Sequence, residues 1–188
     1  MKHAKKIFLD FSSVNIQNLK LIPFTGHVVF EGRVGVQRFN LEKSVEQEII
    51  KLLPEELENS IISVNLTYIQ DTIPHKHNYD YSVINYYFET DNYETIFYEG
   101  PVSNERIVSD DFGNAYIEAD IDKIIPIESF IAQSGDTYIL DTRAIHSVSH
   151  IDNLSAGYDK FRPLISGKRK AIQIWTSCPF LKISKMFS

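Results

Sequence analysis

Two histidines, His75 and His77, flank a single residue just after Pro74, where a long run of aromatic and β-branched residues begins. On a β-strand, residues two apart point to the same face of the sheet, so both imidazoles could reach one point. Imidazole nitrogen is a ligand for zinc, copper, iron and nickel. The spacing therefore indicates a metal site, and a third ligand would leave coordination positions open.

The segment SGDTYILDTRAIHSVSH offers that third ligand. A Gly-Asp turn precedes an apolar strand, residues 141–143 turn the chain, and His146 opens the next strand. His150 lies four residues further on, close to a loop, and we expect it not to bind metal. The competing interpretation is that all of these histidines are ordinary polar strand residues or hydrogen-bonded core residues.

The elements that would position these histidines are mostly strands. Short runs rich in β-branched and aromatic residues alternate with turn residues. They predict strands at 6–11, 27–32, 34–40, 61–70, 81–90, 94–99, 115–119, 124–132, 137–141, 143–148 and 171–177. Eight or more short strands behind one helix favour a mainly β sandwich or jelly roll.

The one strong helical pattern lies at 43–57. Ser44 with Gln47 resembles a capping box, and Pro54 either ends the helix or starts a second short turn. An apolar stripe indicates that the helix packs on the outside of the strands. The stripe consists of Val45, Ile49, Leu52 and Leu53.

Length, net charge and cysteine content limit the classes of protein to which this chain could belong. A chain of 188 residues suits one domain, 1–188, and its net charge of −6 argues against nucleic-acid or anionic membrane surfaces. The single cysteine, Cys178, rules out an internal disulfide and a thiolate zinc site. No apolar run approaches a membrane span of about 20 residues or a secretory signal, so we expect a cytoplasmic protein.

Three motifs, in order, resemble the 2-oxoglutarate and Fe(II)-dependent oxygenases, which are built on a double-stranded β-helix, or jelly roll. IPHKHNYDYSVINYYFETDNYETIFYEG is similar to the first ligand pair and the strands after it. GDTYILDTRAIHSV is similar to the segment carrying the distal histidine, and KRKAIQIWTS to the strand carrying an arginine. The resemblance covers residues 61–177 as the barrel, with residues 1–60 buttressing it.

The resemblance implies Fe(II) on His75, His77 and His146, and 2-oxoglutarate bound through its distal carboxylate by Arg169. Arg143 and Arg162 are fallback anchors. The alternative for Arg169 is a solvated loop end at 168–170.

If the first strand continues regularly past His77, Asn85 and Tyr87 share its face and could hydrogen-bond a co-substrate. Thr95 and Phe97 are similar, weaker candidates. Aromatic packing is the alternative for the tyrosine.

His77 departs from the family pattern, which has aspartate at this position. Three neutral imidazoles leave the metal site one unit more positive than two histidines and a carboxylate. His77 also fills the position that chloride-using relatives leave open, which argues against halogenation. Three-His iron sites occur in cupin dioxygenases, which share the barrel.

Two alternatives therefore stand beside the oxygenase. One is a three-His cupin-type metal dioxygenase or isomerase without 2-oxoglutarate, and the other is a non-catalytic jelly-roll binding protein.

The oxygenase interpretation predicts dioxygen and a small-molecule, amino-acid or peptide substrate as partners, with no nucleic acid and no membrane. The segments 100–113 and 152–167 would supply lids over the site. The sequence leaves open whether the protein forms a homo-oligomer.

Overall fold

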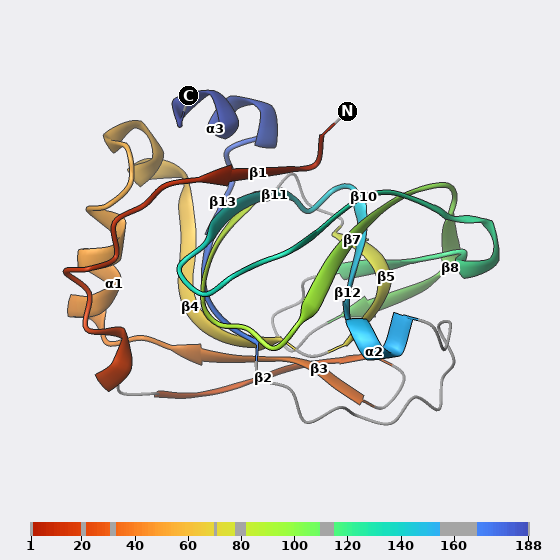
Figure 1. Cartoon of the computed structure of the whole chain (residues 1–188), viewed down its shortest axis with the longest axis horizontal. Helices are drawn as coiled ribbons and strands as arrows, with labels where there is room; N and C mark the ends of the chain where they lie inside the picture. The colour runs from red at the N-terminus through yellow and green to blue at the C-terminus, as the bar shows by residue number, and fades with distance from the viewer. Residues whose placement is uncertain are drawn as a thin grey trace.

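The computed structural model describes residues 2–19, 22–30, 33–69, 71–77, 82–109, 115–154 and 169–187. Its strands form two antiparallel sheets, one of which curls into a half-barrel (Figure 1). The larger sheet has the order β1-β11-β6-β13-β4-β3-β2. Its strands are β1 (Ala4–Ile7), β11 (Thr137–Asp141), β6 (Ser82–Glu89), β13 (Lys170–Thr176), β4 (Ile61–Ile69), β3 (Arg33–Asn40) and β2 (Ile22–Phe30).

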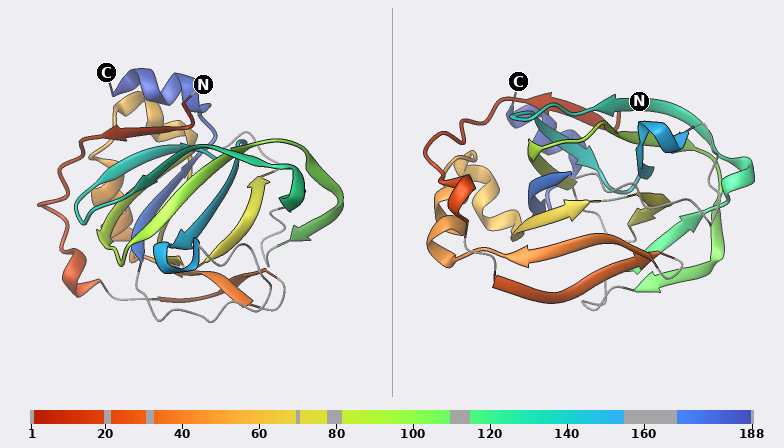
Figure 2. Two further views of the ribbon diagram at one scale, coloured as in Figure 1. Left: turned by 45° about the vertical axis from the view of Figure 1, so that its right-hand side comes forward. Right: turned by 60° about the horizontal axis from the view of Figure 1, so that its bottom comes forward.

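The smaller sheet has the order β10-β7-β12-β5-β9-β8 and faces the larger one across the interior (Figure 2). Its strands are β10 (Ile125–Ile131), β7 (Tyr93–Glu99), β12 (Ile145–His150), β5 (Thr72–His77), β9 (Ala115–Ala119) and β8 (Val102–Ser109). The mainly β class predicted from the sequence is confirmed.

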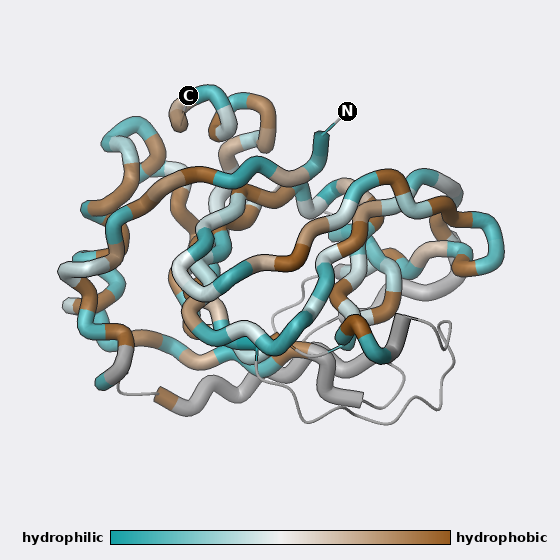
Figure 3. The backbone as a smooth tube through the Cα atoms, in the orientation of Figure 1, coloured by the Kyte–Doolittle hydropathy of each residue, from teal (hydrophilic) through white to brown (hydrophobic). Residues whose placement is uncertain are grey.

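Strand β13 shows how the sequence builds this arrangement. Alternate side chains of a strand point to opposite faces, and most of this strand is buried on both. Ile172 and Ile174 face the outer layer, whereas Gln173 and Trp175 face the interior between the sheets. Figure 3 shows the same alternation of hydrophilic and hydrophobic residues along the backbone of other strands.

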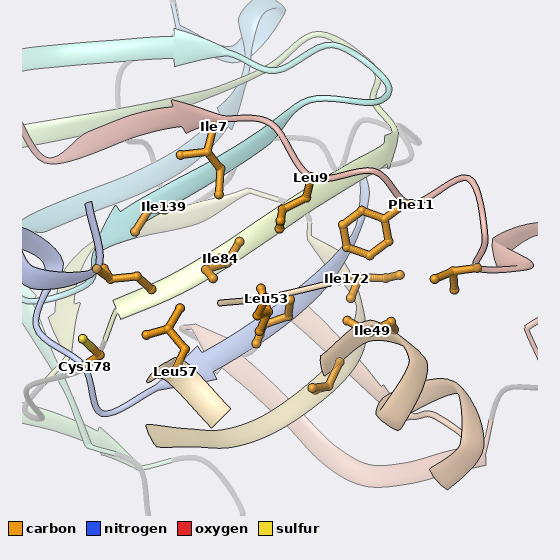
Figure 4. Close-up of a cluster of buried hydrophobic side chains, with 14 of the residues drawn as sticks. Ile7, Leu9, Phe11, Ile49, Leu53, Leu57, Ile84, Ile139, Ile172 and Cys178 are labelled. Carbon is orange, nitrogen blue, oxygen red and sulfur yellow. The ribbon is translucent and has the colours of Figure 1, made fainter. Parts of the chain in front are cut away.

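Helices cover the outer face of the larger sheet. They are α1 (Lys43–Ile50), the 3-10 helix η2 (Glu55–Ser60) and α3 (Phe180–Met186). Ile49, Leu57 and Ile183, each almost fully buried, join the same core cluster as Ile84 and Ile172 of the sheet (Figure 4). Because the outer face of the sheet supplies this apolar core, the inner face can carry polar side chains. The short helices η1 (Ile16–Asn18), η3 (Ile121–Lys123) and α2 (Ile151–Leu154) complete the described elements.

The register of β5 against β12 determines what faces the interior. His146 pairs with His75, but Val148 pairs with Thr72, so β5 has an irregularity with one extra residue between these pairs. Pro74 lies there, where a residue without an N–H does not interrupt the ladder. The irregularity keeps Thr72 and both histidines of β5 on the interior side.

Several expectations about elements are wrong. The helix begins at Lys43 after Glu42, which makes no side-chain capping bond, so Ser44 is not its cap. Helix α1 ends at Ile50, well before residue 57, whereas the alternative that Pro54 starts a second short turn is confirmed, because Pro54 is the N-cap of η2. Residues 9 and 11 reach the core without belonging to a strand, and the terminal helix α3 was not expected.

The expected lid at 100–113 is also wrong over much of its length, because residues 102–109 form β8, which pairs with β9. Its residues 110–113 lie outside the described residues. Of the second expected lid, 152–167, residues 152–154 belong to α2 and the rest lie outside the described residues. No helix in the described ranges is long and apolar enough to cross a membrane.

Candidate metal centre

Three imidazoles meet between the sheets. One ligand atom from each of His75, His77 and His146 lies within 4.8 Å of the other two, and all three side chains are buried. The ring centres of His75 and His146 are 4.6 Å apart, and each lies 5.4 Å from that of His77. The structure therefore brings together the three histidines that the sequence predicted as ligands.

Strand pairing explains why they meet. His146, the second residue of β12, lies directly opposite His75 of β5, and side chains opposite each other in an antiparallel pair are close neighbours. His77 lies two residues along β5 on the same face. Its backbone N–H donates to the carbonyl of Thr142, 2.9 Å away, which ties the end of β5 to the turn before β12.

Backbone carbonyls orient two of the rings. Nδ1 of His75 is 2.7 Å from the carbonyl oxygen of Ile73, and Nδ1 of His146 is 2.9 Å from that of Ala144. A carbonyl only accepts, so each Nδ1 carries the hydrogen and each Nε2 keeps its lone pair. This arrangement, in which the nitrogen remote from the metal donates to a carbonyl, is common among metal-binding histidines.

Burial also keeps the rings neutral. Desolvation, followed by the charge of His146, lowers the pKa of His75 from 6.5 to about 3. Desolvation is likewise the largest cause lowering the pKa of His77 and His146. Metal ligation requires the neutral imidazole, so all three are in the competent form at neutral pH.

The donor set fits a transition metal. Three neutral nitrogen donors within one buried cluster suit iron, zinc, copper or nickel, whereas calcium and magnesium require oxygen ligands. The group contains no carboxylate or thiolate. The three-His group could hold such an ion, and its composition does not select among these metals.

A cavity lies beside the three rings, and the predicted anchor Arg169 lines it. Only 2% of Arg169 is exposed, so the interpretation of residues 168–170 as a solvated loop end is wrong for this side chain. Its Nη2 donates to Oγ1 of Thr95 at 2.7 Å, and its guanidinium carbon is 4.5 Å from the ring centre of Tyr87.

Arg169 has two further donors buried with it. Among the described residues, its Nε and Nη1 meet no hydrogen-bond partner. Leaving a buried donor unsatisfied costs about 1–3 kcal/mol, and more for a charged group. An anion in the cavity would remove this cost.

Asn85 and Tyr87 line the same cavity, although the reason given for them was wrong. They lie on β6 of the larger sheet, not on the strand of His75 and His77, which belongs to the smaller sheet. Asn85 Nδ2 donates to the Tyr87 hydroxyl at 2.9 Å, while its Oδ1 is buried with no partner among the described residues. Their contact with a co-substrate stays a prediction.

The remaining candidate residues differ in burial and in their position relative to the three histidines. Phe97 is buried 5.9 Å, ring centre to ring centre, from His146, whereas Arg143 is half-exposed beside Asp141. Arg162 lies outside the described residues. His150 is buried at the end of β12 against the ring of Tyr93 and is not part of the three-His group.

Among the residues of the cavity wall that sequence reasoning missed are Arg38 of β3 and Tyr116 of β9. Arg38 Nη2 donates to the Tyr116 hydroxyl at 3.2 Å. A signal existed in β3: Phe39 packs in the outer core, so its neighbour Arg38 must point inward. This signal can be used only when it is known which face of β3 packs in the outer core.

No protein-family model matches the chain, and no curated protein matches it.

Proposed function

We propose that the protein is a non-haem Fe(II) oxygenase that uses 2-oxoglutarate, built on a double-stranded β-helix. One observation carries the proposal: the buried guanidinium of Arg169 lines the same cavity as the three imidazoles and has two donor nitrogens without partners in the described chain. A planar guanidinium binds a carboxylate through two parallel hydrogen bonds. The cavity thus combines a metal-binding group with a site for an acid.

The spacing along the sheet suits a small diacid. Arg169 is held by Thr95, which pairs with Val148, two residues along β12 from His146. Two residues of a strand span roughly 7 Å. A molecule of the length of 2-oxoglutarate could meet the metal with its keto acid end and Arg169 with its distal carboxylate.

The bound iron would supply the oxidation of an unactivated C–H bond by dioxygen. In the overall balance, 2-oxoglutarate, dioxygen and R–H give succinate, carbon dioxide and R–OH. The chain's own residues orient the reactants: Arg169 holds the distal carboxylate, and the neutral rings of His75, His77 and His146 hold the metal. Burial between the two sheets excludes bulk water from the reacting groups.

Anaerobic titration of the Fe(II)-loaded protein with 2-oxoglutarate tests the proposal. We expect a metal-to-ligand charge-transfer band in the visible that saturates with one 2-oxoglutarate per chain. Arg169→Gln should weaken 2-oxoglutarate binding by about 30-fold or more, since truncating one partner of a buried charge pair costs about 2–5 kcal/mol. Arg143→Gln, which removes a half-exposed guanidinium from a surface turn, is the matched control and should bind as the wild type does.

A second candidate is a three-His dioxygenase or isomerase whose substrate binds the metal directly. The all-imidazole composition of the group favours it. Metal binding without the visible band, and without any effect of Arg169→Gln, would select this candidate. A protein that binds no metal would leave only a non-catalytic binding function.

A further inference from the structure

Two polar atoms on the inner face of the larger sheet are buried without partners. The indole Nε1 of Trp175 and the amide Oδ1 of Asn85 each meet no hydrogen-bond partner among the residues that the structure describes. Both side chains line the cavity beside the three imidazoles. Indole nitrogen only donates, and a carbonyl oxygen only accepts. Because buried polar atoms normally have partners, we expect a ligand of this cavity to bring one acceptor and one donor.

Strand pairing makes these two side chains neighbours. Trp175 of β13 lies opposite Val83 of β6, and Asn85 lies two residues further along β6. Side chains in this diagonal relation project from the same face of the sheet and lie about 7–8 Å apart. Two hydrogen bonds of about 2.9 Å each, with one amide group between them, span up to about 8 Å. One small polar group can therefore meet both atoms.

The proposed co-substrate does not supply the missing donor. The Nδ2 of Asn85 donates to the Tyr87 hydroxyl at 2.9 Å, which leaves Oδ1 as the amide atom that needs a partner. Ionised carboxylates and a keto group only accept hydrogen bonds, so 2-oxoglutarate has no donor for Oδ1. A second molecule that carries an N–H would satisfy it. This assigns Asn85 to the substrate, whereas Arg169 binds the co-substrate.

The charge around the cavity favours a neutral group. The guanidinium of Arg169 lines the cavity, none of the described residues that line it is acidic, and a bound metal ion would add positive charge. These charges would repel a cationic donor such as an ammonium group. A carboxylate has no donor and would place an oxygen against Oδ1 of Asn85. A neutral group with both a donor and an acceptor satisfies both wall atoms.

The shared face of the sheet narrows the group further. Because Trp175 and Asn85 project from one face, the acceptor and the donor of the ligand have to lie on the same edge. A primary carboxamide presents its C=O and one N–H side by side, whereas a trans peptide bond points them to opposite sides. Val83 and Leu140 also line the cavity and would accept an aliphatic body.

We infer that the substrate is a small aliphatic primary amide, whose C=O accepts from the indole N–H of Trp175 and whose N–H donates to Oδ1 of Asn85. The ring centre of Trp175 lies 5.1 Å from that of His77, so the hydrocarbon part would lie beside the imidazoles.

The inference rests on the proposed function for the statement that this amide is hydroxylated. In that reaction one oxygen atom of dioxygen enters a C–H bond of the amide, and the other enters the succinate formed from 2-oxoglutarate with release of carbon dioxide. The amide site itself rests on Trp175 and Asn85 alone.

Calorimetric titration with isobutyramide tests the site without turnover. The protein is loaded with Zn(II), which is redox-inactive, and is titrated with and without saturating 2-oxoglutarate. Two molecules of the same shape are the matched controls. Methyl isopropyl ketone has a methyl group in place of the amide nitrogen, and isobutyrate has an anionic oxygen there.

We expect isobutyramide to bind in both cases. The ketone should bind at least about 5-fold more weakly, because it leaves Oδ1 of Asn85 without a donor. With Arg169 occupied by 2-oxoglutarate, isobutyrate should also bind more weakly than the amide. These comparisons use the wild-type protein, so they do not depend on the folding of any variant.

Variants test the two contacts separately. Asn85→Leu removes the acceptor and Trp175→Phe removes the donor, and each should weaken isobutyramide binding by about 3–10-fold. Tyr86→Phe is the matched control and should bind as the wild type does, because Tyr86 is adjacent to Asn85 on β6 but packs against the outer core.

The inference is overturned if the wild type does not bind isobutyramide, or binds the ketone or isobutyrate equally well in the presence of 2-oxoglutarate. It is also overturned if either folded variant, Asn85→Leu or Trp175→Phe, binds isobutyramide unchanged. Mutual exclusion of isobutyramide and 2-oxoglutarate would overturn it as well, because the amide would then occupy the place of the co-substrate.

The two proposals can fail separately. Isobutyramide binding that depends on Asn85 and Trp175, in a protein that never binds 2-oxoglutarate, would end the proposed function and leave the amide site standing. Binding of 2-oxoglutarate that depends on Arg169, together with no preference for isobutyramide over the ketone, would end the inference alone.

Discussion

At the scale of single residues, substitution of His77 distinguishes an oxygenase that uses 2-oxoglutarate from a three-His enzyme that does not. His77 occupies the place where the oxygenases that the sequence resembles have an aspartate. His77→Asp should still bind metal, since a carboxylate at the same strand position is also a ligand. If the protein uses 2-oxoglutarate, this variant should keep or gain turnover of 2-oxoglutarate to succinate.

A specialised three-His enzyme predicts a different result for the same variant, which would retain iron and lose activity. His77→Ala is the companion variant. Equal metal affinity with alanine and with histidine at this position would show that His77 is not a ligand.

Removing either of the paired histidines should be more severe. His75→Ala and His146→Ala each remove one of three ligands. We expect each to weaken Fe(II) binding beyond the roughly 10–100-fold that loss of an outer hydrogen-bond partner costs. Anaerobic metal titration measures this loss.

His150→Ala is the matched control, because His150 is buried on the same strand as His146 but outside the group. It should bind Fe(II) within a few-fold of the wild type. A loss as large as that in His146→Ala would mean that the ligand set is wrong.

At the scale of elements, the outer helices stabilise the sheet that carries half of the cavity wall. Ile183 of α3 is fully buried in the outer core, whereas Leu181, two residues earlier, is 55% exposed. Ile183→Ala should lower the free energy of unfolding by about 2–5 kcal/mol, and Leu181→Ala by much less. Urea unfolding measures both, and equal effects would contradict the packing described for α3.

Metal affinity should follow a different pattern. Provided that it remains folded, Ile183→Ala should bind Fe(II) like the wild type, because Ile183 packs on the outer face of the sheet, away from the histidines. A large loss of metal affinity in this folded variant would mean that the helix layer also positions the ligands.

The elements show what a sequence can predict. Runs of β-branched and aromatic residues between turn residues predicted most strands to within a few residues, and 137–141 without error. Local patterns did not show that β5 and β6 enter different sheets, because the pairing of strands depends on segments far apart in the sequence. The inward position of Asn85 was therefore right for the wrong reason.

Some residues of the candidate site could also be predicted from the sequence, and others could not. Spacing of two residues was enough to find His75 and His77, and the motif order found His146. Arg38 could not be found, because its role depends on β3 lying next to β4, a pairing between segments that residue types alone do not specify. That two donor nitrogens of Arg169 lack partners likewise depends on how all the strands around the cavity are arranged.

At the scale of the whole molecule, the buried histidines make stability depend on pH. In the unfolded chain their pKa is near 6.5, whereas burial lowers the pKa of His75 to about 3 and lowers those of His77 and His146. As pH falls below 6.5, the unfolded chain therefore takes up protons that the metal-free folded protein does not. Stability should fall as the pH drops below about 6.5, by up to about 1.4 kcal/mol per pH unit for each imidazole that stays neutral in the folded protein, and the contribution of His75 continues down to about pH 3.

Urea unfolding of the metal-free protein between pH 7.5 and pH 4.5 measures this dependence. His146→Gln, which removes one titrating group, should show a shallower loss, provided that it folds. An equally steep dependence in the wild type and in this variant would contradict the neutral, buried state of His146.

The proposed metal site consists of three imidazoles from two neighbouring strands that hold one ion. X-ray absorption spectroscopy of the anaerobic protein loaded with one equivalent of Fe(II) tests this ligand set, because scattering from imidazole rings counts the histidines bound to iron. We expect three imidazoles per iron in the wild type and two in His146→Ala under conditions that force metal binding. Two or fewer imidazoles in the wild type, or an unchanged count in His146→Ala, would contradict it.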